Sequence, residues 1–63
     1  MAYTPTTTDL LKCAQRELAL RKRVYRNRVE TRRMSAGEAE FQIICMQAIV
    51  EHFERLVEKE RLL

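Results

Sequence analysis

A single glycine, Gly37, and a single proline, Pro5, interrupt this chain of 63 residues. Glycine and proline are the residues that most often break helices and build tight turns, so a chain that nearly lacks them has few places to reverse direction. Multistranded sheets and glycine-rich phosphate loops are therefore disfavoured. The hydrophobic fraction of 46% and the charged fraction of 33% are typical of long amphipathic helices. The sequence predicts an all-α fold in one small domain.

The first helix is expected over residues 9–33. Thr6 or Thr8 can cap it, and Asp9 in its first turn suits the positive end of the helix dipole. Residues 1–8, which are rich in threonine, are expected to form a flexible N-terminal arm. Apolar residues recur at helical spacing along one side: Leu11, Ala14, Leu18, Tyr25 and Val29, widened by Leu10, Cys13, Leu20 and Val24. The opposite side is basic, so the helix is amphipathic.

The second helix is expected over residues 36–61. Ser35 and Glu38 fit a capping box, in which the serine hydroxyl and the glutamate carboxylate each bond a free backbone N–H. Only about two or three residues would then connect the helices, and short connections make antiparallel neighbours. Apolar positions step by four and three along this helix, the spacing that packs against a partner helix: Ala39, Ile43, Met46, Val50, Phe53 and Val57. Residues 9–63 are therefore predicted to form an antiparallel two-helix hairpin.

The second helix carries a further apolar stripe that one partner helix cannot cover. Its members are Phe41, Cys45, Ala48, Ile49, His52 and Leu56. A helix that is apolar most of the way round is normally buried, and two helices of one chain cannot bury it. We therefore expect these residues to form the interface of a homodimer, most simply a two-fold four-helix bundle.

Positive charge is concentrated in the first half of the chain, where nine Lys or Arg residues stand against three acids up to Met34. The residues on the basic side of the first helix are Arg16, Lys22, Arg23, Arg26, Arg32 and Arg33. Such a face can solvate the helix and pair with glutamates of the second helix, bind an acidic protein, or bind nucleic-acid phosphates. No recognition helix or row of stacking aromatic residues accompanies the cations, which favours a protein partner over nucleic acid.

Arg21 and Arg28 are expected beside the apolar stripe of the first helix. Glu17 stands four residues before Arg21, the spacing of an ion pair within a helix. Arg21 and Arg28 either lie at the edge of the core with their charged ends in solvent, or make polar contacts that fix the alignment of the helices or bind a partner.

Few residues can support catalysis or metal binding. Cys13, Cys45 and His52 are the only candidates for a soft metal site, and the expected hairpin places the two cysteines about 16 Å apart along the helices. That distance excludes an intrachain disulfide and a shared zinc ion. We expect buried cysteines, with His52 satisfied in the core or at a subunit contact. Ser35 has no histidine within reach, and we expect no pocket of about a few hundred Å³, so neither an enzyme nor a cofactor is predicted.

A distinctive pattern begins with the run Arg16-Glu17-Leu18-Ala19-Leu20-Arg21-Lys22-Arg23-Val24-Tyr25 and continues with Val29, Met34-Ser35, Glu38-Ala39, Ile43, Met46 and Ile49. The pattern covers about residues 16–53 and resembles a group of very small proteins encoded by tailed phages and prophages of Proteobacteria. Members of that group read Arg-Arg-Val-Tyr-Pro in the first helix and Gly-Arg-Met-Thr at the turn. Here Arg26 replaces the proline and Arg32 the glycine, so the first helix is expected to run longer, into a tighter turn.

The resemblance implies a viral origin, and therefore a location in the cytoplasm of an infected or lysogenic bacterial host. Small helical phage proteins often bind and block a host protein, so by analogy it implies a role as an adaptor or inhibitor. The residues themselves point to a soluble chain without a membrane partner. The N-terminus lacks the basic start and apolar core of a signal peptide. The longest apolar stretch, residues 43–50, is far shorter than the roughly 20 residues of a membrane span.

Overall fold

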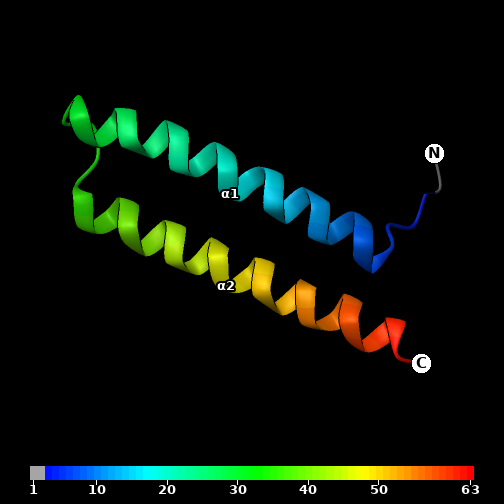
Figure 1. Ribbon diagram of the computed structural model, residues 1–63. Coiled ribbons are helices and arrows are strands. Elements are labelled where there is room, and N and C mark those ends of the chain that lie inside the picture. The colour runs from blue at the N-terminus through cyan, green and yellow to red at the C-terminus, as the bar shows by residue number, and fades with distance from the viewer. Residues whose placement is uncertain (1–2) are drawn as a thin grey trace.

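A computed structural model of the chain describes residues 3–63 as an antiparallel hairpin of two helices (Figure 1). Helix α1 spans Thr7–Glu30 and α2 spans Ala36–Arg61, and the two pack against each other. The described residues contain no strand, so the predicted all-α hairpin is confirmed. Residues 1–2 lie outside the described part and residues 7–8 belong to α1. Flexibility of the arm at residues 1–8 stays a prediction.

Helix α1 begins at Thr7 because Thr6, one of the two expected caps, is its N-cap. The Thr6 hydroxyl accepts the Asp9 N–H at 3.1 Å, and the Asp9 carboxylate accepts the Thr6 N–H at 2.9 Å. These two bonds form a capping box. The Tyr3 hydroxyl donates to the same carboxylate, and this bond, followed by those of Thr6, lowers the pKa of Asp9.

Helix α1 ends at Glu30 rather than near residue 33, and Arg32 takes the left-handed backbone conformation with φ 60°. The Arg33 N–H donates to the Arg28 carbonyl at 2.8 Å, and the Arg32 N–H donates to the Val29 carbonyl at 3.1 Å. These bonds form a Schellman motif, in which glycine usually holds the left-handed position. The expectation of a longer helix at Arg32 is therefore wrong, because this arginine adopts the conformation of a terminating glycine.

Replacing Arg32 with glycine is expected to raise the free energy of unfolding by about 0.5 to 1 kcal/mol. A left-handed residue other than glycine costs about 1 to 2 kcal/mol, and the greater freedom of glycine in the unfolded chain cancels part of the gain. The melting temperature should rise by about 2 to 8 °C, measured by circular dichroism. The control is Arg33→Gly, at a position without positive φ, which should not raise the melting temperature. Equal melting of R32G and the native protein would contradict backbone strain at Arg32.

Helix α2 has the bounds that the sequence predicts. The Ser35 hydroxyl accepts the Glu38 N–H at 3.1 Å, whereas the return bond of the expected capping box does not form within residues 3–63. Residues 31–35 separate the helices, so the connection is longer than the expected two or three residues. At the open end of the hairpin, the Thr7 hydroxyl donates to the Glu60 carboxylate at 2.7 Å.

The core lies between the helices and is small. Its buried cluster consists of Ala14, Leu18, Met46 and Val50, with Leu11 and Ile43 packed against it. The predicted stripe of α2 is confirmed, because every member is buried or half-buried: Ala39, Ile43, Met46, Val50, Phe53 and Val57. The molecule extends 47 × 29 × 12 Å, which is a single layer of two helices with both broad faces uncovered.

Candidate protein-interaction surfaces

The basic face comprises the cations predicted from the sequence, and all of them are exposed: Arg16, Lys22, Arg23, Arg26, Arg32 and Arg33. Among the described residues the ion pairs are Glu17–Arg21 and Glu58–Arg61, each within one helix. The expected pairing of basic-face residues with glutamates of α2 therefore does not occur. None of the cations of the basic face forms an ion pair within residues 3–63.

One hollow of about 380 Å³ lies on the basic face. Arg16 and Arg23 stand at its sides, and Ala19 and Leu20 complete its lining. Leu20 is 41% exposed, so the hollow presents an apolar patch between two guanidinium groups. This combination suits an apolar side chain flanked by carboxylates.

A second hollow, of about 360 Å³, lies between the helices near the turn. Lys22, Arg26 and Glu30 contribute its charged groups. The rest of its lining is drawn from both helices: Tyr25, Val29, Ala36, Ala39 and Ile43. The absence of a pocket of this size is expected for a four-helix bundle and stays a prediction, because the single hairpin has no second layer and leaves its interhelical groove open to solvent.

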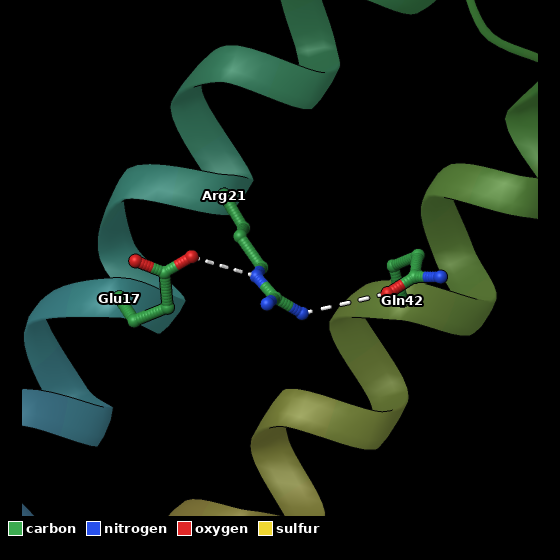
Figure 2. Close-up of polar contacts among 3 residues, drawn as sticks. All are labelled: Glu17, Arg21 and Gln42. Carbon is green, nitrogen blue, oxygen red and sulfur yellow. Dashed lines mark hydrogen bonds and ion pairs between the residues drawn. The ribbon is translucent and has the colours of Figure 1, made fainter.

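Arg21 connects the two helices through polar contacts (Figure 2). Its Nε donates to Glu17 Oε1 at 2.9 Å, and its Nη1 lies 3.5 Å from Gln42 Oε1. The bond to Glu17 raises the pKa of Arg21, so the guanidinium keeps its charge. The Arg21 side chain is 28% exposed, which places it at the edge of the core. The sequence does not identify Gln42 as its neighbour, because that contact depends on the register between the helices.

Arg28, the other arginine expected beside the apolar stripe, is exposed. Its guanidinium lies over the ring of Tyr25, 5.9 Å from the ring centroid. The contact is a cation–π interaction at the surface, worth about 0.5 to 1 kcal/mol. Arg28 therefore packs on a half-buried aromatic ring and does not enter the core.

An apolar face extends over both helices on the side where Arg21 meets Gln42. Cys45 and Ile49 follow Gln42 at intervals that keep them on one side of α2, and Leu20 follows Glu17 in the same way on α1. The face consists of Leu10, Cys13, Leu20 and Val24 of α1 and of Phe41, Cys45, Ala48, Ile49, His52 and Leu56 of α2. Phe41 is 63% exposed and Ile49 is 44% exposed. The residues predicted to form a dimer interface are thus largely uncovered in the single chain.

The cysteines and the histidine also belong to this uncovered side. Cys13 and Cys45 are free and exposed, so their expected burial does not hold in the single chain. His52 is exposed, and its ring meets the edge of Phe53 with 5.5 Å between centroids. Within residues 3–63, no three His, Cys, Asp or Glu side chains are grouped to hold a metal ion.

Neither described helix combines the length and the apolar character that crossing a membrane requires. Comparison with models of known protein families, with curated proteins and with solved structures returned no match to this chain. These comparisons do not bear on the resemblance of residues 16–53 to small phage proteins, which stays a prediction from the sequence.

Proposed function

We propose that this chain is a small accessory protein of phage type that binds an acidic host or phage protein, as an adaptor or inhibitor, in the cytoplasm of an infected or lysogenic bacterium. The basic face is the observation that carries this proposal, because its cations are exposed and none forms an ion pair among the described residues. Unpaired like charges repel one another and add nothing to the fold. An acidic partner that neutralises them gains specificity and a faster association rate.

The hollow between Arg16 and Arg23 favours a protein partner over nucleic acid. Its apolar lining suits an aliphatic or aromatic side chain, and the two arginines can bond carboxylates beside it. Proteins that bind single-stranded nucleic acid usually stack bases on aromatic side chains within the basic surface. The exposed large aromatic residues in the described part, Tyr3 and Phe41, lie outside the basic face. Tyr25, which lines a hollow with Lys22 and Arg26, is half-buried. Phosphate binding by the basic face is the alternative function.

We also propose that the working form is a homodimer in which the apolar faces of two copies pack into a four-helix bundle. Domains normally consist of two packed layers, and this chain forms one. A chain of 63 residues with five buried hydrophobic side chains among residues 3–63 is only marginally stable alone, and a second copy commonly supplies the missing burial. Arg23 and Arg26 are exposed and do not belong to the apolar face, so the dimer leaves these cations accessible, and Leu20 borders both surfaces.

Reversing the charge of Arg23 and Arg26 in one variant, R23E/R26E, is expected to abolish capture of the acidic partner from bacterial lysate. Both residues are exposed, so the melting temperature should stay nearly unchanged, within about 0.5 kcal/mol of stability. The matched control is R55E/K59E, which reverses two exposed cations of α2. Pull-down with each immobilised protein, followed by identification of the captured chain, measures the effect.

Capture that survives the R23E/R26E change would move the site off the basic face. The apolar surface near Phe41 and Ile44, which are 63% and 57% exposed, would then be the next candidate. Binding of random-sequence DNA that falls steeply between low and physiological salt, and that R23E/R26E removes, would support the nucleic-acid alternative.

A further inference from the structure

Glu17 and Arg21 lie at the middle of α1, on the apolar face. We infer that two copies of this chain pack about a two-fold axis that crosses α1 near position 19 and α2 near position 45. In this arrangement each Arg21 reaches Glu17 of the partner subunit. The inference rests on the proposed dimer and specifies its geometry and its central contact.

The register of the hairpin brings positions 19 and 45 to one level. Ala14 and Leu18 share the buried cluster with Val50 and Met46, and in antiparallel helices four steps forward along α1 match four steps back along α2. The contact between Arg21 and Gln42 gives nearly the same alignment, so Leu18 is about level with Met46 and position 19 is about level with position 45. A single two-fold axis that lies between the two stacked hairpins, perpendicular to the helices, can therefore pass α1 at position 19 and α2 at position 45.

Rotation about this axis places each helix antiparallel to the same helix of the partner subunit. A residue that comes before position 19 of α1 therefore faces the partner residue that comes the same number of positions after it. Glu17 and Arg21 are placed in this way, two residues on either side of position 19. Helix α1 runs over Thr7–Glu30, so this position is also close to its midpoint and the overlap of the two α1 helices is nearly complete. Each acid then faces a base of the partner subunit.

The guanidinium of Arg21 has donors left for a second carboxylate. Arginine carries five N–H donors, and in the single chain one bonds Glu17 and another reaches Gln42 at the long distance of 3.5 Å. The carboxylate of Glu17 likewise has acceptor positions left, and its side chain is 44% exposed. The intrachain pair can therefore become a four-membered network across the axis.

On α2 the same axis brings together groups that suit each other. Phe41 faces Ile49 of the partner subunit, so two exposed apolar residues cover one another. Glu38 faces His52 of the partner subunit, which joins a carboxylate to an imidazole. Cys45 lies on the axis itself. This self-complementarity favours a second copy as the occupant of the apolar face, because a two-fold interface requires a surface to match itself.

Thiol crosslinking tests the position of the axis. Bismaleimidoethane joins two thiols only when they lie close together. The C13S protein, which keeps Cys45, should give a covalent dimer in high yield. The matched variant C45S, which keeps Cys13, should stay monomeric on a denaturing gel, because the two Cys13 residues would be about 18 Å apart along the helices. Crosslinking through Cys13 and not through Cys45 would overturn the proposed axis.

Exchange of charges tests the central contact. E17R and R21E each place like charges across the axis, so each should weaken self-association by about tenfold or more in sedimentation velocity. An equal mixture of the two variants should restore association to the native level, because each chain then meets the opposite charge in its partner. Loss of the intrachain pair alone cannot produce this recovery, so failure to recover on mixing would overturn the inference.

Different results would overturn the proposed dimer and the proposed position of its axis. A native chain that is monomeric at micromolar concentration would overturn the dimer and its axis together. A native dimer that Cys45 does not crosslink, and whose charge variants do not recover on mixing, would overturn the axis alone. Loss of partner capture in R23E/R26E tests the basic face in either case.

Discussion

Replacing Leu18 with alanine is expected to lower the free energy of unfolding by about 2 to 5 kcal/mol. Leu18 is 8% exposed and belongs to a core of five buried residues, so few neighbours can move to fill the space it leaves. A chain of this size has a total stability of about 3 to 9 kcal/mol, so the variant should lose much of it. Urea denaturation followed by circular dichroism measures the change.

The control for this change is Leu62→Ala, which removes the same atoms from a side chain that is 77% exposed. It should alter stability by no more than about 0.5 kcal/mol. If L18A and L62A unfold at the same urea concentration, the packing between α1 and α2 does not hold the hairpin together.

Replacing Ile49 with aspartate is expected to convert a native dimer into a monomer or an unfolded chain. Ile49 is 44% exposed in the single chain, so in a monomer the change should cost no more than about 0.5 kcal/mol. In the proposed dimer the same carboxylate would be buried without a counter-charge, which costs several kcal/mol. Sedimentation velocity at micromolar concentration distinguishes the two cases.

Leu62→Asp is the matched control, because Leu62 is also exposed and does not belong to the apolar face. The L62D protein should sediment like the native dimer and melt at nearly the same temperature. Sedimentation of the native chain itself as a stable monomer would contradict the dimer.

The faces of both helices can be predicted from the sequence because they follow from local spacing. A helix repeats every 3.6 residues, so the intervals between Ala39, Met46 and Val50 determine which side of α2 is buried. The start of α2 follows from Ser35, whose hydroxyl caps it. The Glu17–Arg21 pair is equally local, since residues four apart on a helix are neighbours.

The end of α1 could not be predicted in the same way. Arginine is a good helix former, and the left-handed conformation that Arg32 adopts is usual for glycine. Nothing in the local sequence marks Glu30 as the last helical residue.

The contact between Arg21 and Gln42, and the hollow near the turn, depend on how α2 is aligned with α1. That alignment follows from the length of the connection at residues 31–35, which the sequence pattern underestimates. The exposure of the cations was predictable from the helix wheel. The missing ion pairs to α2 were not, because they depend on the same alignment.

The backbone joins the two helices only at the turn, and this covalent connection determines the order in which the contacts between the helices can form. The Thr7–Glu60 bond at the open end joins residues 53 positions apart. The entropy lost on closing a chain segment rises with its length, so pairs beside the turn form first and pairs at the open end form last. We expect opening to proceed in the reverse order, from the ends of the chain towards the turn. Arg26, Arg32 and Arg33 are therefore expected to lie in the part of the molecule that folds earliest and opens last.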